Sequence, residues 1–383
     1  MDPTPHPAAP AEFPLDQHLA YLNHAAVAPW PKRASDAVIR FALENSRLGA
    51  THYPQWLEVE KQLRHNLSMM INAPSPDDVA LVKNTSEALS MVASGLAWEP
   101  GDEVVITNQE FPSNRIVWES LADKGVTVRV ADISREDVTP EGAIEDALSE
   151  RTRLLAVSSV QYGTGLKLDA EHLGALCRSH GILFCLDAIQ SIGAEPLDVQ
   201  AAQVDFTMAD GHKWMLGPEG LALFYVRPEV REQLHLTEFG WHMVADRGNF
   251  DRKDWEPAPD ARRFECGSPN LLCAHALEAS TSLLLETGLD TVRDRIQQRV
   301  AHLESGLTGL NGVRGITRAS PQRRLGIYTF DMPEHDTRAA QARLFEEGVI
   351  CAYRGGGIRF SPHYYTPWAA LENALNRVED LLR

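Results

Sequence analysis

Lys213 is the residue in this sequence with the clearest capacity for covalent chemistry. It lies between two predicted strands, one beginning at Val204 and one at residues 221–226, and a Gly-Pro-Glu-Gly turn follows it at 217–220. A lysine held beside apolar surface and another cationic group has a lowered pKa, and its amine can form a Schiff base with a carbonyl cofactor. The ordinary alternative is a solvated loop lysine. This stretch alone leaves both interpretations open.

An acidic residue, Asp187, directly follows the very apolar strand predicted at residues 182–186. A carboxylate in such a place is costly unless it meets a cation or hydrogen-bond donors. It is either a helix cap or paired structural acid, or the group that keeps a pyridinium nitrogen protonated. Gln190 follows three residues later and can reach the same space.

Thr85 and Ser86 join a predicted strand to a predicted helix. Hydroxyls and unpaired amides at a helix start form a ready phosphate site. The alternative is simple capping, because Asn84 and Glu87 have the spacing of a capping box.

Three further side chains stand at turns or strand ends. Phe111, in a strand-to-helix turn, either stacks on a planar ring or belongs to the core. Gln161 ends the strand predicted at 154–160. Arg359, between two apolar residues, suits the bidentate binding of a carboxylate, or else forms a structural ion pair.

Strands and helices alternate from Asp78 onward, which favours a mostly parallel sheet with helices on both faces. In such sheets ligands bind beyond the carboxyl ends of the strands, where the polar residues above lie. The predicted strands are 79–82, 104–107, 126–130, 154–160 and 182–186, and the predicted helices are 35–47, 55–71, 86–96, 113–122, 141–148 and 170–178.

The chain divides into three predicted parts: an N-terminal tail and extended segment (1–30), a large α/β domain (31–261) and a small C-terminal α+β domain (262–383). The small domain is expected to contain helices at 274–304, broken at Gly288, and at 337–347 and 367–382. Its predicted strands are 326–330, 349–353 and 358–360. The first fourteen residues predict a frayed, extended tail and no signal peptide, because they have no cationic or long apolar segment and contain Pro3, Pro5, Pro7, Pro10 and Pro14.

Composition narrows the classes of partner. The formal charge of −17 argues against a nucleic-acid or anionic-membrane partner, and no apolar run approaches the length of a membrane span. The cysteine number is odd and there is no Cys-x-x-Cys, which is typical of a reduced cytoplasmic protein without a cysteine-rich metal site, and no metal is expected. The cysteines are Cys177, Cys185, Cys266, Cys273 and Cys351.

From about Tyr21 to the last helix, the order and spacing of these motifs resemble the class V aminotransferase family of pyridoxal 5'-phosphate (PLP) enzymes. The family includes cysteine desulfurases, isopenicillin N epimerase and kynureninase. Gly211-His212-Lys213 with its glycine turn is the most specific part of the match, and residues 187–190 come next. The resemblance implies the fold type I architecture, PLP as cofactor and a homodimer.

The resemblance also implies roles for individual residues. Lys213 becomes the Schiff-base lysine and Asp187 the partner of the pyridine nitrogen. A second group would contact the cofactor elsewhere: Gln190 near its phenolic oxygen, Phe111 over the ring, Thr85, Ser86 and His212 at the phosphate, and Ser268 at the phosphate of the neighbouring subunit. The substrate carboxylate would bind Arg359, with Gln161 and Asn23 nearby.

Two departures from the cysteine desulfurase pattern bear on the reaction. Phe111 stands where desulfurases stack a histidine, and it carries no exchangeable proton. The loop before Arg359 reads Arg354-Gly355-Gly356-Gly357 and has no cysteine in the place of the desulfurase nucleophile. Cys351 precedes this loop in a predicted strand, where a buried inert thiol is expected.

The expected activity is therefore PLP chemistry on a small amino acid, through an external aldimine and a carbanion, and an aminotransferase-like reaction is favoured. A cysteine desulfurase-like or other β-eliminating lyase is the first alternative, and an amino-acid epimerase the next. A catalytically inactive PLP-binding relative is the non-enzyme alternative. The combination of Lys213, Asp187, His212 and Arg359 argues against it, because binding the cofactor alone does not need Arg359.

Overall fold

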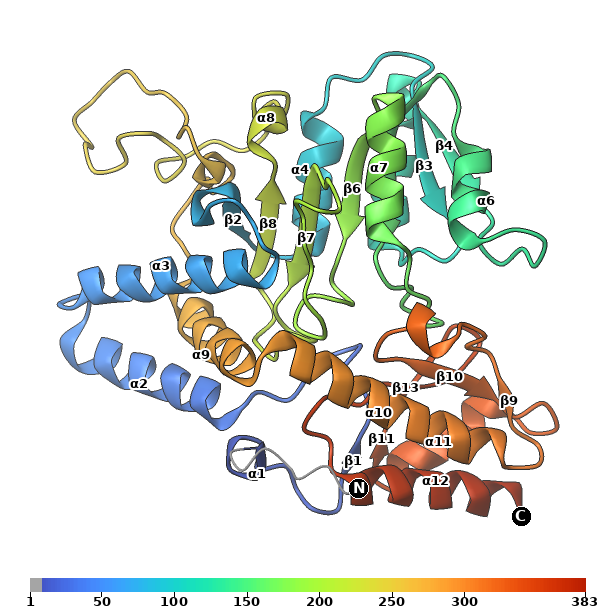
Figure 1. Cartoon of the computed structure of the whole chain (residues 1–383). Coiled ribbons are helices and arrows are strands. Elements are labelled where there is room, and N and C mark those ends of the chain that lie inside the picture. The colour runs from blue at the N-terminus through green and yellow to red at the C-terminus, as the bar shows by residue number, and fades with distance from the viewer. Residues whose placement is uncertain (1–8) are drawn as a thin grey trace.

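Seven strands form the main sheet of the protein in the computed structural model, which describes residues 9–383 (Figure 1). Their order across the sheet is β2 (Val79–Val82), β8 (Ala222–Val226), β7 (Phe206–Asp210), β6 (Leu183–Asp187), β5 (Thr152–Ser158), β3 (Glu103–Thr107) and β4 (Thr127–Ala131). Neighbouring strands from β7 to β4 are parallel, whereas β8 is antiparallel to both β2 and β7. The predicted mostly parallel sheet is confirmed.

Apolar residues on successive positions of these strands face opposite sides of the sheet, as the pleat requires. In β3, Val104 and Ile106 join one hydrophobic core and Val105 joins the other. The first core packs under α4 (Thr85–Gly95) and α5 (Ser113–Glu119). The second packs under helices that include α6 (Pro140–Ala147) and α7 (Ala170–His180). Helices therefore cover both faces of the sheet.

Three long helices lie side by side next to the second core: α2 (Lys32–Leu48), α3 (Tyr53–Met70) and α9 (Leu271–Thr287) (Figure 1). The short helix α8 (Pro228–Arg231) follows β8. Single 3₁₀ turns lie at η1 (Pro76–Asp78), η2 (Ala122–Lys124), η3 (Ala261–Phe264) and η4 (Pro321–Arg323).

A separate antiparallel sheet lies in the C-terminal part of the chain. Its order is β12 (Ala352–Arg354), β13 (Gly357–Phe360), β10 (Tyr328–Asp331) and β9 (Arg314–Gly315). The helices around it are α10 (Leu289–Thr308), α11 (Thr337–Glu346) and α12 (Trp368–Leu382). The strand predicted at 349–353 is instead two strands in different sheets. The first of them, β11 (Val349–Ile350), pairs in parallel with β1 (Ala20–Tyr21) near the N-terminus, and only the second joins β13.

The prediction of an extended tail is wrong for residues 9–12, which are helical. Ala9–Glu12 form the short helix α1, and Arg33 donates to Glu12 over 2.8 Å. Phe13 stacks on Tyr365 with the ring centroids 3.4 Å apart, so apolar burial holds this segment against the protein. The prolines at positions 3, 5 and 7 lie outside the described residues.

The division into domains stays a prediction, and we propose one change to it. Helix α9 packs against α2 and α3, whereas α10 packs against α12 and the antiparallel sheet. Gly288, at which the helical stretch was expected to break, separates α9 from α10 with a φ of 83°. A boundary at Gly288 fits this packing better than one at residue 262.

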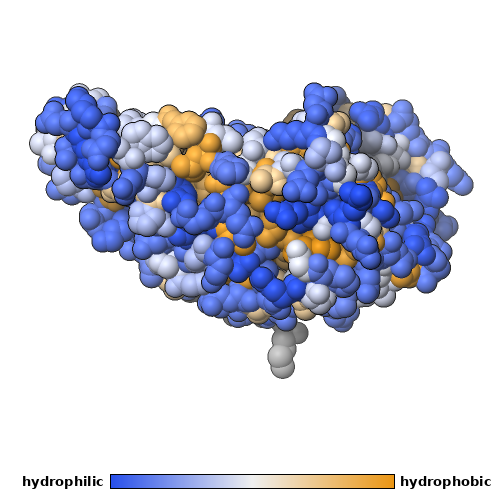
Figure 2. Space-filling view, turned by 90° about the horizontal axis from the view of Figure 1, so that it is seen from above, coloured by the Kyte–Doolittle hydropathy of each residue, from blue (hydrophilic) through white to orange (hydrophobic). Residues whose placement is uncertain are grey.

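The surface is mostly hydrophilic when seen from above, with apolar residues gathered near its centre (Figure 2). Among residues 9–383, no helix combines the length and the apolar character needed to cross a bilayer.

Candidate active site

Lys213 lies in a tight turn that directly follows β7. The turn is closed by two backbone hydrogen bonds, from the Leu216 amide to the Lys213 carbonyl (3.0 Å) and from the Gly217 amide to the Gly211 carbonyl (2.8 Å). A Cβ atom on Gly217 would come within 2.5 Å of the Leu277 side chain in α9, so the turn packs closely against this helix. The buried packing of the turn fixes the direction of the Lys213 side chain.

The next residue, Trp214, is fully buried and links this turn to the segment that follows β6. Its indole donates to Gln190 Oε1 over 2.9 Å, and Gln190 Nε2 donates to the Ala25 carbonyl over 3.0 Å. Gln190 thus ties the lysine turn to the N-terminal segment.

The Lys213 amine opens into a cavity of about 250 Å³ at the carboxyl ends of β6 and β7. Its lining comes from the N-terminal segment, the N-terminus of α4, the β3–α5 turn, the segments that follow β5, β6 and β7, and the β12–β13 hairpin. The structure therefore brings together most of the residues that the sequence singled out. Eight of the predicted site residues line this cavity: Thr85, Ser86, Phe111, Asp187, Gln190, His212, Lys213 and Arg359.

Lys213 and Asp187 are both buried, and burial shifts the pKa of each toward its neutral form. Desolvation lowers the pKa of the Lys213 amine from 10.5 to about 8, against the attraction of Asp187. Desolvation raises the pKa of Asp187 to about 7, although the Ile189 amide donates to its Oδ1 over 3.0 Å. No hydrogen bond among residues 9–383 uses Asp187 Oδ2, which leaves this oxygen free for a cation in the cavity.

The N-terminus of α4 offers the cavity free hydrogen-bond donors. Asn84 caps the Glu87 amide over 2.9 Å, and the amides of Thr85 and Ser86 have no acceptor within the described chain. The Thr85 hydroxyl accepts from the Asp210 amide (3.1 Å), so its own hydrogen remains available. Two free amides and the Thr85 hydroxyl at the positive end of a helix suit a phosphate. The predicted capping is also present, because Asn84 accepts from the Glu87 amide and leaves the amides of Thr85 and Ser86 free.

Arg359 is a buried cation without a protein counterion. Its side chain is 2% exposed, and no carboxylate lies within 4.0 Å of it in the part of the chain that the structure describes. One nitrogen donates to the Tyr162 carbonyl over 2.8 Å, and Nε has no partner there. Burial lowers the pKa of Arg359 to about 10, which leaves it charged at neutral pH. Within residues 9–383 the predicted alternative of a structural ion pair is therefore excluded, and the arginine faces the cavity unpaired.

We expect replacement of Arg359 by glutamine to lower kcat/KM for the amino-acid substrate by roughly 100-fold, because a bidentate charged contact is lost. Arg359→Lys should restore only part of the activity, because lysine has no planar fork. Since the buried guanidinium has no counterion, Arg359→Gln should leave the melting temperature unchanged or higher. A large fall in melting temperature with unchanged kcat/KM would instead indicate a structural role.

Phe111 and Tyr162 form part of the cavity wall near the lysine. Their rings meet edge to face with centroids 5.2 Å apart, and the Lys213 amine lies 5.6 Å from the centre of the Phe111 ring. Phe111 is partly exposed, so it is free to stack on a planar group in the cavity and is not a core residue.

Three predicted site residues lie outside the cavity lining. Gln161 is fully buried and points toward Glu110 and the Ser158 carbonyl, both 3.4 Å away. Asn23 pairs with Ser361 through a backbone bridge, and its buried Oδ1 has no partner within the described chain. Ser268 lies in a different cavity. Its expected contact is with a neighbouring subunit, so this role stays a prediction.

Several residues of the site were not identified from the sequence. Asp210, at the end of β7, has a carboxylate oxygen 2.9 Å from His212 Nδ1. Its position at a strand end is the same signal that identified Asp187. Ser113 accepts from the Ser86 hydroxyl over 2.8 Å. Two more residues line the cavity without any local sequence signal to distinguish them, Arg354 and Tyr162.

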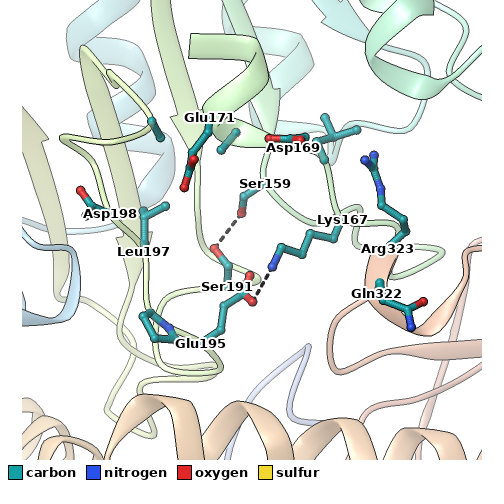
Figure 3. Close-up of a pocket in the computed structure, with 14 residues that line it drawn as sticks. Ser159, Lys167, Asp169, Glu171, Ser191, Glu195, Leu197, Asp198, Gln322 and Arg323 are labelled. Atoms are coloured by element: carbon teal, nitrogen blue, oxygen red, sulfur yellow. Dashed lines mark hydrogen bonds and ion pairs between the residues drawn. The ribbon is translucent and has the colours of Figure 1, made fainter. Parts of the chain in front are cut away.

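A larger cavity of about 410 Å³ is lined by residues that include Ser159, Lys167 and Glu195 (Figure 3). Several of its polar side chains bind one another: Lys167 pairs with Glu195 over 2.6 Å, and the Ser159 and Ser191 hydroxyls are 2.7 Å apart. The Ser159 amide also donates to the Asp187 carbonyl over 2.9 Å. These satisfied groups support the position of Asp187, and the lysine of this cavity is already paired.

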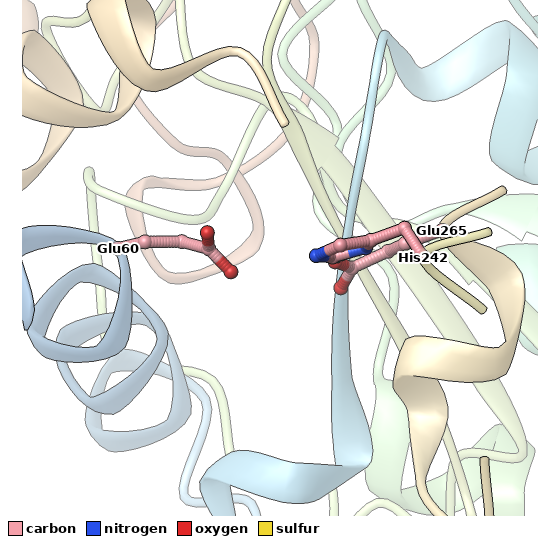
Figure 4. A group of neighbouring side chains, drawn as sticks. All are labelled: Glu60, His242 and Glu265. Atoms are coloured by element: carbon pink, nitrogen blue, oxygen red, sulfur yellow. The ribbon is translucent and has the colours of Figure 1, made fainter. Parts of the chain in front are cut away.

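Glu60, His242 and Glu265 form a buried group whose side chains could ligate a metal (Figure 4). However, Arg64 binds both carboxylates, over 2.8 Å to Glu60 and 2.5 Å to Glu265. Arg247 lies 2.6 Å from His242 Nε2, which must therefore accept, so the proton resides on Nδ1. The guanidinium of Arg64 already supplies the cation that these carboxylates require.

Comparison with known proteins identifies the family. The sequence model described as Aminotransferase class-V matches residues 20–361. The chain belongs to the class-V aminotransferase family. A probable cysteine desulfurase of Methanothermobacter thermautotrophicus is 31% identical to this class-V protein over 375 residues, which cover 92% of each chain.

Solved structures agree on the fold. A cysteine desulfurase from Thermococcus onnurineus superposes with a TM-score of 0.89 at 23% identity, covering 99% of this chain and 98% of that one. The cystine C–S lyase C-DES, in complex with its product cysteine persulfide, gives 0.89 at 24% identity, covering 96% and 99%. A variant of C-DES carries glycine covalently linked to its PLP cofactor, again with a TM-score of 0.89 at 24% identity, covering 97% and 99%. This class-V protein has the fold type I architecture and is a PLP-dependent enzyme.

The cavity fits PLP by the chemistry of its donors. The free amides of Thr85 and Ser86 match a phosphate, the free Oδ2 of Asp187 matches a protonated ring nitrogen, and the Lys213 amine matches an aldehyde. Arg359 remains for a substrate carboxylate. Each of these buried charged groups would therefore have a partner once cofactor and substrate are bound.

The lowered pKa of Lys213 predicts how fast the cofactor-free protein takes up PLP. Only the unprotonated amine attacks an aldehyde, so the rate should rise with pH and level off above about 8. At pH 7 about a tenth of the amine is unprotonated with this pKa, against well under a thousandth for an ordinary lysine. Absorbance of the protein-bound cofactor measures the rate, with Nα-acetyl-lysine as the solution control. A rate that climbs steadily to pH 10 would contradict the shift.

Proposed function

We propose that this class-V enzyme is a C–S lyase that removes sulfur from a small sulfur-containing amino acid by β-elimination. The names of its curated relatives, which are cysteine desulfurases, support a sulfur-releasing reaction over the transamination that the sequence favoured. Such a lyase was the first alternative. The observation that carries the proposal is the chemistry of the cavity. None of the five cysteines, all within the described residues, belongs to its lining.

A mechanism with a protein persulfide needs a reactive thiolate close to the substrate. Cys351, the cysteine closest in sequence to Arg359, is buried between β11 and β12, and burial raises its pKa to about 12. Cys185 is buried within β6, the strand that ends at Asp187, and burial together with that carboxylate raises its pKa far above the ordinary value. The proposed reaction therefore releases the sulfur without its uptake by a cysteine of this chain.

The residues of the cavity have these proposed roles. Arg359 binds the substrate α-carboxylate and so orients the bonds at Cα. When bound, PLP supplies an electron-withdrawing ring that stabilises negative charge at Cα, and Asp187 keeps that ring protonated. Lys213 Nζ holds the cofactor at rest and then accepts the Cα proton. The Cβ–S bond breaks with its electron pair on sulfur, and water converts the remaining fragment into pyruvate and ammonium.

The contacts to the cofactor are proposed with the roles that the resemblance implies. Thr85, Ser86 and His212 bind the phosphate, Phe111 covers the ring and Gln190 lies near its phenolic oxygen. Ser268 is proposed to reach the partner's phosphate in a homodimer, for which light scattering should give twice the 42.5 kDa of one chain. A monomer would exclude that role.

Identification of the products tests the proposed function. Purified enzyme with L-cysteine or an S-substituted L-cysteine should release pyruvate, ammonium and the sulfur-containing fragment in equal amounts. Alanine with a protein persulfide would indicate a desulfurase, and a keto acid that retains sulfur would indicate a transaminase. Inversion at Cα without cleavage would indicate an epimerase. Each of these outcomes would overturn β-elimination as the main reaction.

A further inference from the structure

The β12–β13 hairpin presents two arginines on one face. Arg354 pairs with Gly357, and Arg359 pairs with Ala352. Paired residues of an antiparallel ladder share a face, and residues two apart on a strand share a face, so Arg354 and Arg359 project to the same side. The turn between the strands consists of the two glycines at 355–356, with φ of 60° and 87°, which only glycine adopts readily.

Both arginines line the active-site cavity, but at different depths. Arg359 is buried at its base, whereas Arg354 is exposed at its mouth. Neither has a carboxylate partner within 4.0 Å among the described residues. Within the same residues, the Arg354 side chain donates to a single acceptor, the backbone carbonyl of Tyr353, over 2.9 Å. This contact leaves most of its guanidinium available to a ligand.

The hairpin turn is positioned by a close approach of two loops. A Cβ atom on Gly355 would lie 2.4 Å from the Gly163 carbonyl, so the turn touches the segment that follows Tyr162. The carbonyl of Tyr162 holds Arg359. Thr329, which pairs with Arg359 in β10, donates to the Gly163 carbonyl over 2.8 Å. The same segment therefore sets the positions of both arginines.

Arg354 is the one cation of the described cavity lining to which the proposed function gives no partner. Under the proposed function, the phosphate binds at the N-terminus of α4, the ring nitrogen faces Asp187 and the α-carboxylate binds Arg359. Arg354 lies close enough for its charge to lower the pKa of both Lys213 and Arg359. A second unpaired cation in a small cavity favours a second anionic group on the substrate.

We propose that Arg354 binds an anionic group at the far end of the substrate side chain, so that the preferred substrate is an L-amino acid whose β-sulfur carries an anionic arm. This inference rests on the proposed function. For an S-sulfonate arm, the Cα–H and Cβ–S bonds break, the proton passes to Lys213 and the electron pair leaves on sulfur as thiosulfate. Water then gives pyruvate and ammonium, and no oxidant or reductant is needed.

The test compares substrates whose β-sulfur carries arms of different charge. S-sulfo-L-cysteine carries a sulfonate, L-cystine carries a carboxylate with an ammonium group, and S-methyl-L-cysteine carries no charge. Steady-state pyruvate release by the holoenzyme is measured for the wild type, Arg354→Gln and Arg354→Lys. Arg338→Gln is the matched control, because Arg338 stacks on Tyr353, whose side chain lies on the opposite face of the same hairpin. For a compound that turns over too slowly, its inhibition constant replaces kcat/KM.

Arg354→Gln should lower kcat/KM for S-sulfo-L-cysteine by roughly 10- to 100-fold, mainly through KM, and change S-methyl-L-cysteine little. Arg354→Lys should recover part of the loss, and Arg338→Gln should match the wild type. A similar loss for L-cystine would extend the site to carboxylate arms, and no loss would restrict it to sulfonates. Equal losses for charged and neutral arms, or none for either, would overturn this inference while β-elimination stood. A wild type that releases pyruvate from none of the three would overturn the proposed function itself.

Discussion

Replacing Lys213 by alanine is expected to lower turnover by on the order of 1000-fold or more, because one side chain both holds the cofactor and moves the Cα proton. The amine is buried, its pKa is lowered to about 8, and no other lysine among the described residues lines the cavity. The visible absorbance of lysine-bound PLP should disappear from the purified variant. Steady-state pyruvate release and the absorption spectrum measure the two effects.

Lys167→Met is the control for this substitution, because Lys167 lines the larger cavity and pairs with Glu195. It should keep the absorbance and most of the activity. If Lys213→Ala retained turnover and Lys167→Met lost it, the catalytic lysine would be Lys167 and the active site would lie in the larger cavity.

Replacing Asp187 by asparagine should slow turnover by about 100- to 1000-fold while PLP stays bound, since a single preorganised charge partner is lost. Asparagine has nearly the same shape and can still accept from the Ile189 amide. The phosphate donors at α4 and the Lys213 amine remain in place. Comparison of kcat with the affinity for PLP, from equilibrium dialysis, separates the two effects.

A carboxylate outside the active site provides the matched control. Glu171→Gln removes an exposed charge from the larger cavity and should leave kcat near the wild-type value. Normal turnover in Asp187→Asn, or loss of the cofactor without any change in kcat of the loaded enzyme, would remove the assigned role of Asp187.

The elements of the fold were predictable because their signals are local. The apolar runs of β3, β5 and β6 and the helix start at Thr85 can be recognised within a few residues. Asp187 and Lys213 were found for the same reason, since each follows a buried strand. The split of residues 349–353 into two strands was not predictable, because it depends on pairing with β1, more than 300 residues earlier in the chain.

The parts of the site that could not be predicted from the sequence depend on contacts between residues far apart in the chain. Arg359 meets the Tyr162 carbonyl across 197 residues, and this contact helps to decide between an ion pair and a free cation. Arg354 joins the site only through the register of the hairpin and the contact of its turn with Gly163. Gln161 carried a plausible local signal, but its side chain is directed to Glu110 and not into the cavity.

Identification of the lysine that carries PLP tests the central claim most directly. Holoenzyme treated with borohydride fixes the cofactor to its lysine, and digestion with mass spectrometry locates the modified peptide. We expect the added mass on Lys213, in the peptide that contains His212 and Trp214. The added mass on Lys167 or any other lysine, with Lys213 unmodified, would contradict the assignment of Lys213.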